Sequence, residues 1–265
     1  MSILPYVDQQ ALYNQWRLDL PANDPANLPL TTSEIPVYLC PLDLTRNKDS
    51  MGDSSYAPNG GVGFTRRMSN GVPDCPVSLQ HAALDLDGDG SACAGISADQ
   101  EDRDRFKKLG LFFLETWNVA NTRRHHAIAD IKDGTSQTFM IGENVRVGYD
   151  PEDEQGRFCD STPQRAAFYI GNPCPSLSCT SGAVDYSLGN AANFRINSGL
   201  PAAEGRSSVP NSFHQGGVHM GYADGHVAFL SELIDGRVYS ALASPQGMLL
   251  DGTPLAQVLV SSTDS

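Results

Sequence analysis

An acidic loop at residues 84–95, LDLDGDGSACAG, has the residue types and spacing of a metal-binding segment. Asp85, Asp87 and Asp89 alternate and are followed by Gly90, which is the D-x-D-x-D-G beginning of an EF-hand-type calcium loop. Three carboxylates this close repel one another, and a hard cation relieves that repulsion. Position 12 of the loop would be Ile96, where an EF-hand has a bidentate glutamate, so a true EF-hand is not expected. Further ligands for calcium are expected among the carboxylates that follow: Asp99, Glu101 and Asp102. The alternative is an acidic, solvated turn.

A second group of residues, near the C-terminus, suggests zinc. The candidate ligands are imidazoles and one carboxylate: His214, His219, His226, Asp224, His125 and His126. A hairpin turning at Asp224-Gly225 would place His219 opposite Leu230, about 13 Å from His226 at roughly 3.3 Å per residue. One zinc ion cannot bind both histidines at about 2 Å. We therefore expect a structural role for His214, Asp224 and Gly225, in which Asp224-Gly225 makes the turn and His214 hydrogen-bonds a neighbouring loop.

Signatures of catalysis are missing from the chain. It has no G-x-S-x-G nucleophile elbow, and the run NGGVGF at 59–64 is not followed by the Lys-Ser/Thr and helix of a phosphate-binding loop. The segment DGTSQT (133–138) is expected to be a turn or a helix cap. No catalytic residue is predicted, and a hydrolase is the least favoured function.

The elements that must position these residues are predominantly short strands and loops. The clearest is a hairpin at 218–231, in which two alternating runs flank Asp224-Gly225, the preferred pair for a two-residue type I′ turn. In that register Tyr222 faces Val227, and one face, taken as the core face, holds Val218, Met220, Tyr222, Val227 and Phe229. Further strands are expected at 35–41, 138–143 and 166–171, and helices at 8–18, 99–117 and 232–247. In the second helix Gly110 is a candidate end or kink, and the apolar run at 111–117 is alternatively a strand.

Six cysteines favour an oxidising compartment: Cys40, Cys75, Cys93, Cys159, Cys174 and Cys179. Their number is even, their spacings are wide and no C-x-x-C pair exists, so disulfides are a better interpretation than a zinc ribbon. Cys174 and Cys179 enclose only four residues and are expected to form a local disulfide. The alternative is six buried free thiols in a cytosolic protein.

Composition and charge limit the partners. The 265 residues carry a net charge of −13, so nucleic acid and anionic membranes are not expected to bind, whereas cations are. No apolar run of about 18 residues predicts a membrane span, and the first ten residues show no export signal. We expect a single domain over 1–265, with an inserted calcium-loop-like segment at 70–98 and a long loop insertion at 172–210.

Several blocks together resemble the bacterial pilin-like proteins marked by a C-terminal H-x9-D-G motif, a domain of unknown function. Here the motif runs from His214 to Asp224-Gly225. The other matching blocks occur in the family's order: LPYVDQQALYNQW, VYLCPLD, SSYAPNGG and IADIKDGTSQTFMIGEN. Leu42 and Gln137 depart from the family's usual serine and asparagine.

The resemblance implies an α+β head domain of the type IV pilin or pseudopilin type. Such a domain has an antiparallel sheet, helices on one face and long, disulfide-braced loops; the family's N-terminal hydrophobic helix is absent from this sequence. The implied role is that of a non-enzymatic, extracytoplasmic structural protein, at the cell surface or secreted, whose partners are other pilin-like subunits or a surface assembly. The alternative is an extracytoplasmic module that binds a solute or a glycan.

The acidic loop also resembles short extracellular calcium motifs in which D-x-D-G-D-G is closely followed by cysteine. In those motifs an upstream cysteine closes the loop, which implies a Cys75–Cys93 disulfide here and a structural calcium ion. The usual glutamate after the cysteine is absent, since Ala94 and Gly95 stand there. Elimination then leaves Cys40 to pair with Cys159.

Overall fold

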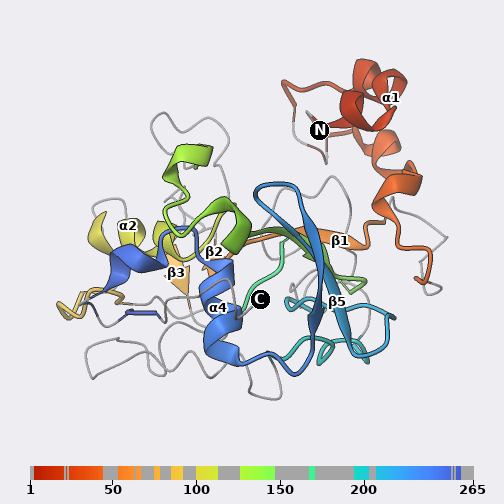
Figure 1. The fold of residues 1–265 in the computed structure, drawn as a ribbon. Coiled ribbons are helices and arrows are strands. Elements are labelled where there is room, and N and C mark those ends of the chain that lie inside the picture. The colour runs from red at the N-terminus through yellow and green to blue at the C-terminus, as the bar shows by residue number, and fades with distance from the viewer. Residues whose placement is uncertain are drawn as a thin grey trace.

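A four-stranded antiparallel sheet forms the centre of the protein (Figure 1). Its strands are β1 (Tyr56–Pro58), β4 (Phe139–Glu143), β5 (Gly217–Tyr222) and β6 (Val227–Ser231), in the order β1-β4-β5-β6. The structure is a computed structural model, and it describes residues 3–20, 22, 24–43, 53–62, 64–66, 75–77, 85–91, 100–112, 126–146, 167–170, 194–202, 207–251, 253 and 255–257.

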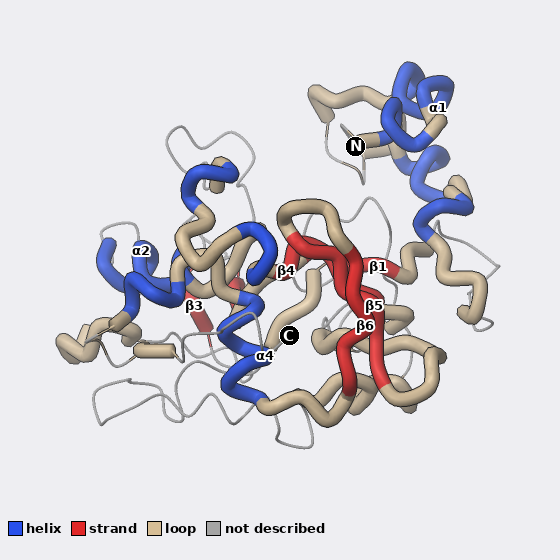
Figure 2. Tube along the Cα trace, viewed as in Figure 1, coloured by secondary structure: helices blue, strands red, loops and turns tan. Residues whose placement is uncertain are grey.

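One face of the sheet is buried beneath helix α4 (Gly236–Ala243), as Figure 2 shows. Asp235 caps the helix by accepting the N–H of Arg237 at 2.9 Å, which satisfies a donor that the first turn leaves free. Phe139 from β4 lies between Tyr222 and Tyr239, with ring centroids 5.1 and 6.2 Å away in edge-to-face geometry. Apolar side chains from β5, β6 and α4 contribute to this core: Val218, Met220, Leu230, Leu242 and Ala243.

The predicted hairpin is confirmed, but its turn and register were predicted wrongly. The backbone N–H of Gly225 donates to the carbonyl of Tyr222 and Gly225 has φ +93°, which makes a three-residue loop with a glycine bulge. A type I′ turn would need positive φ at Asp224 as well, and Asp224 does not have it. The register moves by one residue, so Gly221 pairs with Val227. Val227 and Phe229 consequently point away from the core, while Leu230 faces it.

The N-terminal residues form a small unit of their own. It comprises η1 (Leu4–Val7), α1 (Gln10–Gln15), η2 (Leu28–Thr32) and η3 (Pro36–Tyr38). Leu4, Leu12 and Ile35 form its separate apolar cluster, and in Figure 1 these helices stand apart from the sheet. The strand predicted over 35–41 is wrong, because Pro36 instead begins the 3-10 helix η3.

The remaining described elements surround the main core. They are β2 (Phe64–Arg66), β3 (Cys75–Val77), α2 (Gln100–Lys108), η4 (Ile128–Asp130), η5 (Thr135–Gln137) and η7 (Gly247–Leu250). Strand β2 pairs with β3 in a separate antiparallel ribbon. Of the strand expected at 166–171 the structure describes 167–170, and there Phe168 forms an isolated bridge with Asn59.

Helix α2 is shorter than predicted. Gly110 lies against Gly60 and Gly61 so closely that a Cβ on it would overlap their backbone, and this crossing limits the helix to residues before it. Residues 113–125, which include the end of the predicted helix and His125, lie outside the described part.

The expected α+β class with an antiparallel sheet is therefore confirmed. Among the described residues, no helix has the length and apolar character needed to cross a membrane. Of the two expected insertions, the structure describes only 75–77 and 85–91 of the first, and 194–202 and 207–210 of the second. The expected Cys75–Cys93 and Cys174–Cys179 disulfides involve side chains outside the described part.

Candidate functional site

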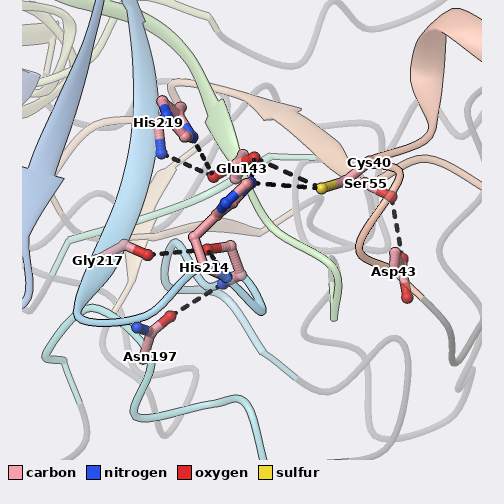
Figure 3. A network of polar contacts seen from close by, with 9 residues as sticks. Cys40, Asp43, Ser55, Glu143, Asn197, His214, Gly217 and His219 are labelled. Atoms are coloured by element: carbon pink, nitrogen blue, oxygen red, sulfur yellow. Dashed lines mark hydrogen bonds and ion pairs between the residues drawn. The ribbon is translucent and has the colours of Figure 1, made fainter.

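Glu143, the last residue of β4, is the centre of a buried polar cluster (Figure 3). Its position is fixed from both sides, since it pairs with Tyr56 of β1 and its carbonyl accepts the N–H of Asn211 at 3.0 Å. Only 3% of its side chain is exposed. A buried carboxylate must be compensated by neighbouring donors or charges, so its partners define the site.

Two side chains converge on one oxygen of this carboxylate. The Nε2 atom of His214 lies 3.0 Å from Glu143 Oε1, and the Sγ atom of Cys40 lies 3.7 Å from the same oxygen. Cys40 Sγ and His214 Nε2 are themselves 3.7 Å apart. In the sequence, Glu143 and His214 lie 103 and 174 positions after Cys40. Figure 3 shows both side chains directed at the carboxylate.

The second carboxylate oxygen is held by His219 on the neighbouring strand β5. The backbone N–H of His219 donates to Glu143 Oε2 at 2.7 Å, and its Nδ1 atom lies 3.3 Å from that oxygen. The ring packs edge-on against His214 and Phe229, at centroid distances of 4.6 and 5.3 Å. The carboxylate is thus fixed in orientation, with Oε1 directed towards Cys40 and His214.

The loop that carries His214 is braced by hydrogen bonds. The Ser212 hydroxyl accepts the N–H of His214 and donates to the carbonyl of Gly217, while the Ser212 N–H donates to Asn197. Asn197 adopts φ +67°, a conformation that asparagine tolerates better than most residues. This bracing holds the imidazole in place even though 27% of its side chain is exposed.

Cys40 is a free, buried thiol located just after η3. Its sulfur faces Glu143 and His214, and Cys159, its expected disulfide partner, lies outside the described residues. Burial raises the pKa of the Cys40 thiol, and the charge of Glu143 adds to the effect. The cysteine pattern favoured a disulfide over a free thiol, and no local motif linked Cys40 to Glu143.

The acidic loop forms a second cluster. Ligand oxygens of Asp85, Asp87 and Asp89 lie within 4.8 Å of one another. Asp85 is buried and accepts the N–H groups of Gly88 and Gly90, at 2.6 and 3.0 Å. Gly90 has φ +93°, in agreement with the sharp turn at position 6 of an EF-hand-type loop.

Of the additional calcium ligands expected from the sequence, Asp102 contacts the acidic loop, whereas Glu101 is paired within α2. Glu101 pairs with Arg105, one helical turn further along α2, at 2.8 Å. Asp102, in contrast, faces the loop and accepts the N–H groups of Leu86 and Asp87. Asp99 lies outside the described residues.

The two ends of the H-x9-D-G motif have separate environments. His214 belongs to the Glu143 cluster, whereas Asp224 lies beyond β5, whose six residues span about 20 Å. Asp224 accepts the N–H of His226 and contacts its Nδ1 atom at 2.6 Å, and the His226 ring stacks on Tyr222. His219 pairs with Phe229, three residues from His226, or about 10 Å along the strand. As expected from the sequence, one ion cannot join His219 and His226, although the structure does bring His219 next to His214.

The other singled-out residues have structural contacts. The Asp133 carboxylate accepts the N–H groups of Gly247 and Met248, at 2.6 and 3.0 Å, and thereby ties the turn at 133–138 to η7. His126 contacts the carbonyl of Lys107 through Nε2 at 2.9 Å. Neither lies in the Glu143 cluster.

The fold and these two clusters define an α+β protein with a central antiparallel sheet, a cysteine–glutamate–histidine cluster at one end of the sheet and an acidic loop elsewhere. By comparison with protein families, the chain belongs to the family described as "Protein of unknown function (DUF1559)", which residues 1–237 match. Searches of curated proteins and of solved structures find no match.

Proposed function

We propose that this protein is a non-enzymatic, extracytoplasmic structural protein, a pilin- or pseudopilin-like subunit of a surface or secretion-associated assembly. The proposal rests on the sequence blocks shared with pilin-like proteins and on the even set of widely spaced cysteines. One structural observation supports it most strongly: the outer face of the sheet carries exposed apolar side chains.

The exposed apolar residues of that outer face come from strands β4 and β6. Ile141, Val227 and Phe229 have exposed fractions of 39%, 65% and 49%. Val227 and Phe229 belong to β6, which is at the edge of the sheet and, within the described residues, pairs only with β5. An apolar edge strand is a surface on which a neighbouring chain can add or pack. In a structural assembly that neighbour is another subunit.

Cross-linking at the cell surface tests the proposal. We expect the wild-type protein to be recovered in covalent species larger than the monomer. The double variant Val227→Asp, Phe229→Asp should reduce these species at least about tenfold, which corresponds to about 1.4 kcal/mol of association free energy. Leu233→Asp is the matched control, because Leu233 is also highly exposed but lies in the loop after β6.

A protein that remains monomeric in every fraction would contradict the proposal. The alternative function, a solute- or glycan-binding module, predicts a different result: a monomer whose melting temperature rises with a soluble ligand, equally in wild type and in the Val227/Phe229 double variant.

We propose calcium as a structural cofactor of the acidic loop. The observation in favour is the gathering of three carboxylates on a loop whose Gly90 has the backbone conformation of an EF-hand-type turn. Asp85, Asp87 and Asp89 would supply carboxylate oxygens, and Asp102 would hold the loop through its backbone N–H groups.

Calorimetry on chelator-treated protein tests the calcium proposal. Calcium at about 100 times its dissociation constant should stabilise the protein by about 2.7 kcal/mol and raise its melting temperature. Asp87→Ala should remove this response. Val227→Ser, an exposed change far from the loop in sequence, should retain it. No heat and no thermal shift at millimolar calcium would contradict the proposal.

A further inference from the structure

Three different ligand atoms of the Glu143 cluster converge on one point. Cys40 Sγ, Glu143 Oε1 and His214 Nε2 are separated by 3.7, 3.7 and 3.0 Å. A tetrahedral zinc ion with one sulfur and two lighter ligands places sulfur about 3.5 Å from nitrogen or oxygen, and nitrogen about 3.3 Å from oxygen, given bond lengths of about 2.3 and 2.0 Å. The observed triangle thus has the dimensions of one face of a zinc coordination tetrahedron.

We propose that Cys40, Glu143 and His214 bind a divalent transition metal ion of the zinc type. Thiolate and imidazole are ligands that zinc prefers, whereas calcium takes oxygen ligands, so this site differs in selectivity from the acidic loop. Three ligands from the chain leave a fourth position for water or an external ligand. The exposed part of His214 lies at the same cluster and gives an ion a route from solvent.

The environment of the carboxylate matches the second shell of a metal site. Glu143 Oε2, the oxygen turned away from the sulfur, is held by the backbone N–H of His219 at 2.7 Å and contacted by the Nδ1 atom of the same residue at 3.3 Å. Ligating carboxylates are commonly held in this way, and the second contact orients the ligating oxygen. Among the described residues, the ion-pair partners of Glu143 are His214 and His219, with no lysine or arginine. A bound cation would supply the positive charge that a carboxylate this buried requires.

The same geometry disfavours a thiol nucleophile. In a catalytic Cys–His–carboxylate arrangement, the histidine uses one nitrogen for the thiol and the other for the carboxylate. Here a single atom, His214 Nε2, faces both Cys40 and Glu143.

A metal at this position would join two parts of the fold. Cys40 follows the N-terminal unit, while Glu143 and His214 belong to the sheet and to the loop before β5. Existing contacts at this junction are hydrogen bonds, from the Ser55 N–H to the Tyr38 carbonyl at 2.8 Å and from the Ser55 hydroxyl to Asp43 at 3.0 Å. Coordination would add a strong link between segments whose buried apolar residues fall in separate clusters.

Cobalt substitution and zinc competition test the proposal on the full chain. The protein is stripped with a chelator, kept reduced, and saturated with calcium so that the acidic loop does not compete. Adding Co²⁺ to wild type should produce one equivalent of a sulfur-to-cobalt charge-transfer band in the near ultraviolet, which Zn²⁺ abolishes. Cys40→Ser keeps the other five cysteines and should lose the band, which would assign the sulfur ligand to Cys40.

Further variants distinguish the residues that bind the metal from residues that only lie near it. His214→Gln and Glu143→Gln should weaken zinc binding at least about 100-fold, and His219→Gln, a positioning residue, about 10-fold. His226→Gln is the matched control, because His226 lies in the same hairpin but contacts Asp224 instead. X-ray absorption of the wild-type zinc complex avoids dependence on variant folding, and should give about one sulfur and three nitrogen or oxygen neighbours. Absence of the cobalt band in wild type, its persistence in Cys40→Ser, or an equal loss in His226→Gln would overturn the proposal.

Discussion

At the scale of single residues, Asn59 is a fully buried connection between three parts of the fold. Its Nδ2 group donates to the carbonyls of Phe139 in β4 and Ala243 in α4, at 2.8 and 2.7 Å. Its Oδ1 atom accepts the N–H of Gly61 at 2.8 Å. All of these hydrogen bonds are made without access to water, so none can be replaced by solvent when the side chain is removed.

Asn59→Ala should therefore be among the most destabilising single changes. Each buried backbone group left without its partner costs about 1–3 kcal/mol, so the free energy of unfolding should fall by about 3 kcal/mol or more. Asn14→Ala on the exposed surface of α1 is the control and should change it by less than about 0.5 kcal/mol. Urea denaturation measures both. Similar midpoints for the two variants would contradict the assigned role of Asn59.

His126 gives a prediction on pH dependence. Burial lowers the pKa of His126 in the folded protein, while its unfolded value is about 6.5. As pH falls below about 6.5, His126 binds a proton in the unfolded chain before it does so in the folded protein. The free energy of unfolding therefore decreases between about pH 6.5 and the lower pKa of the folded state. His126→Gln, which can still donate to the Lys107 carbonyl, should make the unfolding free energy less dependent on pH. Urea midpoints at about pH 7.5 and pH 5.5 measure the slope, and an identical slope in wild type and variant would contradict this role.

At the scale of the elements, two glycines with nearly the same backbone conformation do different things. Gly225, φ +93°, closes the β5–β6 hairpin and has open space where a Cβ would be. Gly61, φ +97°, lies where the chain after β1 crosses the end of α2, and a Cβ there would overlap backbone atoms of Leu109 and Gly110. The first glycine serves the turn alone, whereas the second also permits a close crossing of two segments.

Alanine substitutions at Gly225 and Gly61 distinguish the cost of a positive φ from the cost of steric overlap. Gly225→Ala should cost about 1–2 kcal/mol, the price of a positive φ for a residue with a side chain. Gly61→Ala should cost about 3 kcal/mol or more, because overpacking against backbone adds to the same strain. Denaturant unfolding of the two variants gives the comparison. Equal losses of unfolding free energy in the two variants would contradict a steric role for Gly61 at this crossing.

At the scale of the whole molecule, the last described residues complete the main core. The family match ends at residue 237, yet Tyr239, Leu242, Leu250 and Leu255 are buried in the same cluster as the sheet residues Val218 and Met220. The segment after the hairpin is therefore an integral part of the domain.

Truncating one of these side chains tests that statement. Leu255→Ala should lower the unfolding free energy by about 2–5 kcal/mol, the usual cost of a cavity in a packed core. Leu249→Ala is the control, since Leu249 lies in η7 but is largely exposed, and its effect should stay below about 0.5 kcal/mol. A small effect at Leu255 would show that the C-terminal segment packs loosely.

Local sequence patterns predicted the elements whose signals are themselves local. The hairpin, strand β4, helix α1 and the start of α2 follow from alternation, turn residues and acidic first turns. The strand expected at 35–41 was wrong, and within 167–170 only an isolated bridge forms, because short apolar runs become regular strands only where a partner strand is available. The hairpin register also depended on Asp224, whose backbone conformation the dipeptide Asp-Gly does not fix.

The sequence by itself determined the α+β class, the acidic composition, the six cysteines and the clustering of Asp85, Asp87 and Asp89, because these depend on composition or on residues close together in the chain. Only the tertiary structure decided that Cys40, Glu143 and His214 meet, and that Val227 and Phe229 face outwards. The physical reason is that contacts between residues more than a hundred positions apart depend on strand order and register, and a one-residue shift in register exchanges the two faces of a strand.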